Sequence, residues 1–219
     1  MNTAPFPDNN NSRASDRIEE QLRDMIITLE LAPGAKISEA ELIQRLGCGR
    51  TPLREALQRL AQEYLVNAVP HHGVSIAQLS LPDYVQLIEA VSHVEGIAAR
   101  LAAARITPLD EQRLSDILKR SDEALKRVDI LAFVKCDYEF HEGVAAISRN
   151  RYVIDTVIRL HRLTSRFIYL AWKNGGDTRI SVTEHRSILD ALRKKNASEA
   201  ERLTFEHTQN SKERIINAL

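Results

Sequence analysis

Cysteine and long apolar runs are nearly absent from this chain of 219 residues. Its 2 cysteines, Cys48 and Cys136, cannot build a disulfide framework, which points to a reducing compartment. No stretch approaches the roughly 18 apolar residues of a membrane span. The first residues lack the basic and apolar segments of a signal peptide. We therefore expect a cytoplasmic protein without a membrane partner.

Glycine and proline are also scarce, with 8 and 7 residues, and this scarcity favours a mainly helical chain. Hydrophobic residues make up 43% of the sequence, enough for sizeable cores, so wholesale disorder is excluded. The 30 Lys and Arg balance the 30 Asp and Glu, so bulk charge indicates no particular partner. The length suits two domains.

Local patterns predict a mainly α fold, an N-terminal winged helix-turn-helix followed by an antiparallel six-helix bundle. Residues 1–12 are expected to be a disordered tail, 13–80 the winged helix-turn-helix and 81–219 the helical domain. In the first domain, Asp16 is predicted to cap the first helix, and Thr51, before Pro52, the third. The later helices are predicted at 82–105, 108–127, 130–148, 151–173, 182–195 and 198–218.

The front domain is not basic as a whole, but its arginines gather at the third predicted helix. Arg50, Thr51 and Arg54 begin that helix, where a helix-turn-helix meets the major groove and arginine can grip phosphate or guanine. His72 and Gly73 form the predicted hairpin tip, suited to enter the minor groove. These five residues are our candidate contacts to double-stranded DNA. The alternative is a winged helix that mediates protein contacts only.

The string Arg50-Thr-Pro-Leu-Arg-Glu-Ala-Leu57, with its flanks from Leu31 to Gly73, closely resembles the DNA-binding domain of the GntR family of bacterial transcription regulators. The resemblance implies that Arg50, Thr51 and Arg54 contact bases and phosphates of an operator and that His72 and Gly73 form the wing tip. Two positions depart from the family pattern. Ala40 stands where many members carry Arg, and Gly49 where many carry Ser or Thr.

Four residues of the helical half have the chemistry of a metal site. Asp137 and His141 are four residues apart on an apolar helix face, where a buried carboxylate is costly unless a cation satisfies it. His185 and His207 lie on the apolar stripes of two later helices. Three imidazoles and one carboxylate suit a divalent ion such as Zn²⁺, Mn²⁺ or Ni²⁺. The alternatives are hydrogen-bonded core histidines and a local Asp137–His141 ion pair.

A second resemblance covers about residues 81–219. Asp137-Tyr-Glu-Phe-His141, Glu184-His185 and the closing His207 are similar to the FCD ligand-binding domain of FadR-type GntR regulators, and six helices resemble its VanR branch. In such domains the corresponding Asp and three His hold a metal at the floor of an effector pocket, often for small carboxylates. An arginine that usually pairs with the effector is replaced by Val91. The effector-binding residues themselves stay open.

The resemblance implies a homodimeric regulator that binds DNA, a repressor whose operator binding responds to a small effector bound over the metal. The rival interpretation is a metal-dependent hydrolase, since three histidines, a carboxylate and an open position also describe that chemistry. Against an enzyme, Glu139 and Glu142 point away from the metal-facing side, so no general base is evident. A third interpretation makes the four residues a purely structural cluster.

Overall fold

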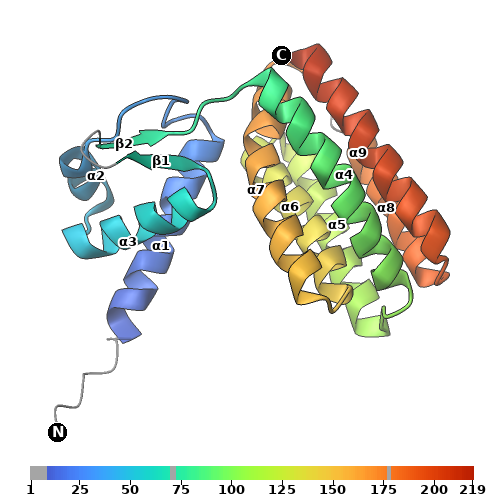
Figure 1. The fold of residues 1–219 in the computed structure, drawn as a ribbon. Coiled ribbons are helices and arrows are strands. Elements are labelled where there is room, and N and C mark those ends of the chain that lie inside the picture. Colours follow the sequence, from blue (N-terminus) through green and yellow to red (C-terminus); the bar gives the residue numbers. More distant parts are fainter. Residues whose placement is uncertain (1–8, 70–72, 177–178) are drawn as a thin grey trace, which may run out of the picture. The chain divides into compact units, whose positions relative to one another are not determined.

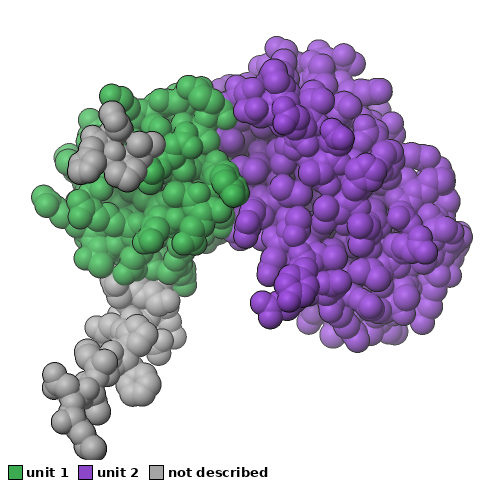
Figure 2. Space-filling model, viewed as in Figure 1, with its two compact units in different colours: residues 1–78 green, residues 79–219 purple. Residues whose placement is uncertain are grey.

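The computed structural model describes residues 9–69, 73–176 and 179–219 of the chain. They belong to two compact units, residues 1–78 and 79–219, which Figure 2 shows in different colours. The fold is mainly helical with one small antiparallel sheet, as the sequence predicted. None of the described helices combines enough length with enough hydrophobicity to cross a bilayer.

The first unit is a winged helix-turn-helix (Figure 1). Its elements are α1 (Asn9–Ile27), α2 (Glu39–Leu46), α3 (Arg50–Gln62), β1 (Val66–Val69) and β2 (Gly73–Ile76). The helix α1 packs on α3, and Leu22, Leu53 and Leu60 are fully buried in this unit's core. The strands pair with Val66 opposite Ile76 and form the wing.

The first helix starts earlier than predicted. It begins at Asn9, inside the tail predicted over residues 1–12, of which residues 1–8 lie outside the described part of the chain. The prediction of Asp16 as a helix cap is therefore wrong. Asp16 lies within α1, where its carboxylate forms an ion pair with Arg59 of α3 and ties the two helices together.

The third helix also begins before the predicted cap. Its N-cap is Gly49, whose backbone is extended (φ −84°, ψ 165°) and which has no side chain to cap the helix. The helix therefore begins at Arg50, and Thr51 is already its second residue. Pro52 is still tolerated because the first N–H groups of a helix have no intrahelical partner. The preceding turn closes at Gly47, which ends α2 in the left-handed conformation (φ 59°) that glycine adopts without strain.

The second unit consists, within the described residues, of six helices that run side by side (Figure 1). They are α4 (Leu81–Ala103), α5 (Pro108–Arg127), α6 (Ile130–Ile147), α7 (Arg151–Lys173), α8 (Arg179–Arg193) and α9 (Ala197–Ala218). Their bounds lie close to the predicted ones. Side-chain caps fix the starts: Thr107 and Asp110 form a capping box at α5, and Asn150 caps α7.

Helix α4 is central to the second unit because it packs against α6, α7 and α9. Alanines that are almost fully buried make this close packing possible, since they add little bulk to the helix: Ala98, Ala99, Ala102 and Ala103. About one turn before these alanines, the same side of α4 carries the buried carboxylate of Glu95 into the core. Glu95 belongs to the site described next.

Candidate metal centre and nucleic-acid surface

The four predicted metal ligands come together inside the second unit. Helix α6 supplies Asp137 and His141, α8 supplies His185, and α9 supplies His207. All four are buried, with at most 6% of any of these residues exposed. Because α6 turns once in about 3.6 residues, Asp137 and His141 project from one face toward the helices that carry the other two.

The histidine nitrogens converge on one point. Nε2 of His185 lies 3.1 Å from Nε2 of His141 and 3.1 Å from Nε2 of His207. Oδ1 of Asp137 is 3.7 Å from the same His185 nitrogen. Ligand atoms held about 2.1 Å from one ion stand about 3.0 Å apart at octahedral angles and about 3.4 Å apart at tetrahedral ones. The two 3.1 Å spacings between histidine nitrogens therefore fit a shared divalent ion, and His141, His185 and His207 form a possible ligand group; the 3.7 Å spacing of Asp137 is longer than either value.

Contacts at the other ring nitrogen, Nδ1, of His141 and His207 support a shared ion. Nδ1 of His141 lies 3.0 Å from Glu95, and Nδ1 of His207 lies 2.8 Å from Glu184, so each Nδ1–H donates to a carboxylate. In a neutral ring this leaves a lone pair on each Nε2, and both lone pairs face His185. A single N–H of His185 can satisfy only one of them, whereas a cation satisfies all three nitrogens.

Electrostatics favour neutral imidazoles at this point. Burial lowers the pKa of His141, although the neighbouring Glu95 carboxylate opposes the shift. Burial, together with the nearby His207 and His141, lowers the pKa of His185 well below its ordinary value. Neutral rings are the form in which histidine binds a metal.

A second layer, absent from the sequence prediction, links the cluster to α4 and α7. Glu95 of α4 is buried and also lies 3.0 Å from Nδ1 of His161 on α7. The opposite nitrogen of His161, Nε2, is 3.1 Å from Oδ2 of Asp137. Asp137 therefore bonds to a histidine on another helix, in addition to facing the Nε2 cluster. Glu95, His141 and His161 form a second group that could hold a metal ion, in which Oε1 of Glu95 and Nδ1 of His161 have no hydrogen-bond partner among the described residues.

Electrostatics favour ionised carboxylates and a protonated His161 in this layer. Burial alone would raise the pKa of Glu95, but His141 and His161 outweigh it and lower that pKa. The pKa of Asp137 is lowered against the same opposing effect, chiefly by its bond to His161. Burial opposes protonation of His161, yet its bonds to Asp137 and Glu95 raise its pKa to about 10. An imidazolium at this position lies between two carboxylates: its Nε2 bonds to Oδ2 of Asp137, and its Nδ1 stands 3.0 Å from Oε1 of Glu95 as an ion pair without hydrogen-bond geometry.

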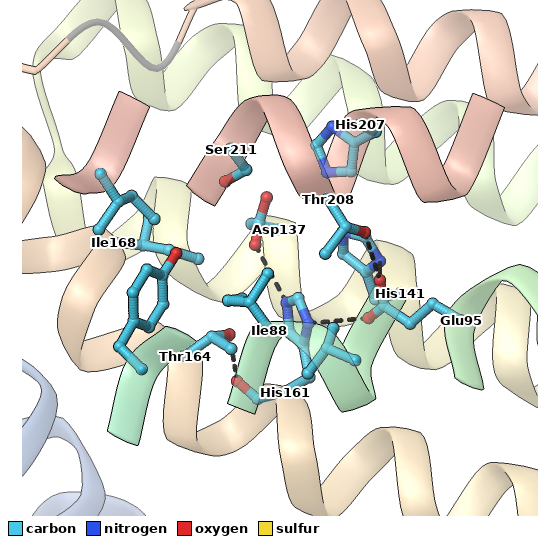
Figure 3. A pocket seen from close by; sticks show the side chains of 13 residues that line it. Ile88, Glu95, Asp137, His141, His161, Thr164, Ile168, His207, Thr208 and Ser211 are labelled. Atoms are coloured by element: carbon cyan, nitrogen blue, oxygen red, sulfur yellow. Dashed lines mark hydrogen bonds and ion pairs between the residues drawn. The ribbon is translucent and has the colours of Figure 1, made fainter. Parts of the chain in front are cut away.

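A small cavity of about 20 Å³ opens beside the cluster (Figure 3). Asp137, His141 and His207 line one part of it, and isoleucine side chains line another. Val91, which replaces the arginine typical of the resembled family, is buried in this wall, so no guanidinium projects from that position. The arrangement places imidazole rings and a carboxylate beside a small cavity that aliphatic and hydroxyl side chains also line.

The candidate DNA contacts in α3 lie on the surface of the first unit. Arg50, Thr51 and Arg54 are exposed in the first turns of the helix. Nε of Arg54 donates to both carboxylate oxygens of Glu39 in α2, at 3.2 and 2.9 Å. Within the described part of the chain no side chain pairs with Arg50, which leaves its guanidinium available for a phosphate or a base.

Other front-domain arginines have structural partners. Arg45 forms an ion pair with Glu30, and Arg59 binds Asp16 and Glu19 of α1. Gly73 begins β2 with φ 85°, and a side chain built there would meet no atom within 4 Å, so the strand is open at this end. His72, the other predicted wing contact, lies outside the described residues.

Comparison with known families agrees with this division. Residues 14–76 match the gntR family of bacterial regulatory proteins, and residues 86–210 match the FCD domain. The first match covers the winged helix-turn-helix, and the second covers the helices that carry the cluster.

Individual relatives span most of the chain. A transcriptional regulator of the helix-turn-helix type from an unstable DNA locus of Streptomyces ambofaciens is 35% identical over 83% of this chain and 77% of its own length. The Nta operon transcriptional regulator of Aminobacter aminovorans is 28% identical over 89% of this chain and 91% of its own length. The solved structure of Escherichia coli McbR/YncC has the same fold, with a TM-score of 0.82 and 19% identity. The match covers 93% of this chain and 97% of that chain. The two relatives found by sequence are transcriptional regulators, not enzymes, so the hydrolase alternative is not supported.

Proposed function

This chain belongs to the GntR family of bacterial regulatory proteins and carries an FCD domain, and we propose that it is a metal-dependent repressor. As a transcriptional regulator it binds DNA through the winged helix-turn-helix. In our proposal a small effector, a carboxylate, binds beside a divalent ion in the helical unit and changes the affinity for operator DNA in the cytoplasm.

The convergence of three Nε2 atoms carries this proposal. Their 3.1 Å spacings around His185 leave lone pairs that a purely structural, hydrogen-bonded cluster does not satisfy. Asp137, His141, His185 and His207 would hold Zn²⁺, Mn²⁺ or Ni²⁺. When bound, the ion supplies a positive charge at the floor of the cavity, to which an anionic oxygen of the effector is attracted. Glu95 and Glu184 orient the imidazoles for this task.

Operator recognition falls to the exposed start of α3. Arg50 and Arg54 would contact phosphates or guanine edges, Thr51 would contact the backbone, and the wing at His72 and Gly73 would approach the minor groove. We propose a homodimer, in which two such heads read the halves of a pseudo-palindromic site. The ion pair between Arg54 and Glu39 would then hold the arginine until DNA replaces the carboxylate.

An effector regulates only if it binds one state of the protein better than the other. A coupling of about 1–3 kcal/mol changes operator affinity by roughly 5–150-fold. The cluster joins α6, α8 and α9 directly, and it joins α4 and α7 through Glu95 and His161. A bound ion and effector would therefore be linked to five of the six described helices of this unit.

The test measures binding to the DNA upstream of the protein's own gene by fluorescence anisotropy. We expect zinc-loaded protein to bind this DNA more tightly than an unrelated fragment, and small carboxylates screened by thermal shift to weaken that binding at least fivefold. In His185→Ala the carboxylates should lose their effect while DNA binding without effector persists. A carboxylate response that is unchanged in His185→Ala contradicts the proposal.

A further inference from the structure

A second group of metal-binding side chains shares one histidine with the first. Glu95 of α4, His141 of α6 and His161 of α7 each offer one ligand atom, and these atoms lie within 4.8 Å of one another. All three residues are buried, with at most 5% of any of them exposed. Two imidazoles and one carboxylate are a common ligand set for divalent transition metals. Figure 3 shows His161 between Asp137 and Glu95.

Two facing atoms of this group lack a hydrogen bond. Oε1 of Glu95 and Nδ1 of His161 are 3.0 Å apart but are not aligned as donor and acceptor, and neither has another partner among the described residues. Leaving buried polar atoms without a hydrogen bond is costly. Ligand atoms held about 2.1 Å from one ion stand about 3.0 Å apart at octahedral angles. Such an ion lies off the line that joins the two atoms, so it suits their spacing and satisfies both.

The cavity beside this group has the size of an ion with a water molecule. Its volume is about 20 Å³, and Glu95, His141 and His161 all line it, together with Asp137. A site needs about 10–15 Å³ to hold one water molecule. Three hydroxyl side chains complete the polar part of the lining: Thr164, Thr208 and Ser211. Their oxygens can accept hydrogen bonds from water bound to the ion.

His141 can serve both groups because its two ring nitrogens face different partners. Its Nε2 lies 3.1 Å from Nε2 of His185 in the first cluster, and its Nδ1 lies 3.0 Å from Oε2 of Glu95. An imidazole ring that has lost both N–H protons has a lone pair on each nitrogen and can bind one ion at each. A second ion would release the Nδ1 protons of His141 and His161 to solvent, while Nε2 of His161 keeps its bond to Asp137.

The surrounding charges permit a second ion but make it bind more weakly than the first. Arg214 already neutralises Glu184, so the negative charges next to the two ions come from Glu95, Asp137 and deprotonated His141. They offset three of the four positive charges of two divalent ions. The remaining repulsion and the displaced protons lower the affinity of the second site. It therefore fills only while free metal is present, and gel filtration empties it.

We propose that Glu95, His141 and His161 form a second divalent-metal site, which fills after the first as the free metal concentration rises. Its ligands are the carboxylate of Glu95 and Nδ1 of both histidines, with water at the open positions. His141 bridges the two ions. This inference goes beyond the proposed function, because the first site and its effector need no second ion.

The test is equilibrium dialysis of metal-free full-length protein against rising, buffered concentrations of free zinc, with bound zinc measured by inductively coupled plasma mass spectrometry. We expect the wild type to bind two ions per chain in two successive steps. His161→Gln should lose the second step and keep the first. His93→Gln, which removes an exposed histidine of α4, is the matched control and should bind two ions like the wild type.

Copper(II) tests whether His141 is shared. Two copper ions bridged by one imidazolate couple their spins, so the electron paramagnetic resonance signal of doubly loaded wild type should fall below that of two separate ions. In His161→Gln the signal should be that of one isolated ion.

The outcomes separate this inference from the proposed function. A wild type that stops at one zinc ion at every free concentration refutes the second site and leaves the first intact. A second ion that persists in His161→Gln, or two copper signals that add in full, refutes the assigned ligands. A wild type that binds no zinc refutes both sites. The wild-type titration decides the stoichiometry even if the variant does not fold.

Discussion

Replacing Glu95 by Gln tests whether the second layer holds the metal ligands in place. The Glu95 carboxylate lies 3.0 Å from Nδ1 of both His141 and His161. A glutamine of the same shape accepts only one of these N–H groups with its oxygen, and its NH₂ group faces the other donor. One hydrogen bond to a charged acceptor is worth about 1.5–3 kcal/mol. Because 1.4 kcal/mol corresponds to a factor of ten, we expect zinc affinity to fall about 10–100-fold.

The measurement is a competition titration against a fluorescent zinc chelator at pH 7.5, with circular dichroism to establish that the variant is folded. Glu201→Gln is the matched control, because this carboxylate lies on α9 and pairs with Arg100 at the surface. Its zinc affinity should equal that of the wild type. A folded Glu95→Gln protein that binds zinc within about twofold of the wild type would refute the role assigned to Glu95.

Three further predictions concern charge, DNA binding and packing. The pKa of His161 is raised to about 10, above its ordinary 6.5, so in metal-free protein its ionic contribution is complete below pH 6.5 and is lost as pH rises toward 10. In urea unfolding, the free energy of unfolding of the wild type should therefore fall by about 2–5 kcal/mol over this pH range, and that of His161→Gln should change less with pH. The same pH dependence in both proteins would contradict this. Arg50→Ala should weaken operator binding about tenfold by anisotropy, with Arg100→Ala unchanged, and equal affinities would remove Arg50 from the interface. Leu53→Ala, at a site that is fully buried, should lower the free energy of unfolding by about 2–5 kcal/mol, and a cost below about 1 kcal/mol would show that α3 is not packed as described.

Helical periodicity and chain breaks were sufficient to predict the six helices of the second unit, because each buries an apolar stripe and starts at a local cap such as Thr107 or Asn150. The start of α3 was harder to predict. Thr51 before Pro52 has the pattern of a cap, but the chain becomes helical directly after the turn at Gly47 and Gly49. Local sequence preference did not decide between these two starting points.

The four candidate ligands could be found from the sequence because each lies on an apolar stripe where a polar side chain needs a partner. Glu95 and His161 carry the same signal, since Glu95 continues the stripe of Tyr84 and Val91 and His161 lies seven residues before buried Ile168. What the sequence could not provide was the pairing. The ion pairs of Glu95 with His141 and His161 join α4, α6 and α7, and only packing brings these helices together.

The central claim is that His185 and its three partners hold one divalent ion, and metal content tests it most directly. Full-length protein is incubated with zinc, freed of excess ion by gel filtration and analysed by inductively coupled plasma mass spectrometry. The account predicts one ion per chain in the wild type and in the exposed-histidine control His93→Ala, and less than about a tenth of that in His185→Ala. A wild type without zinc, or a His185→Ala protein with full occupancy, would contradict it.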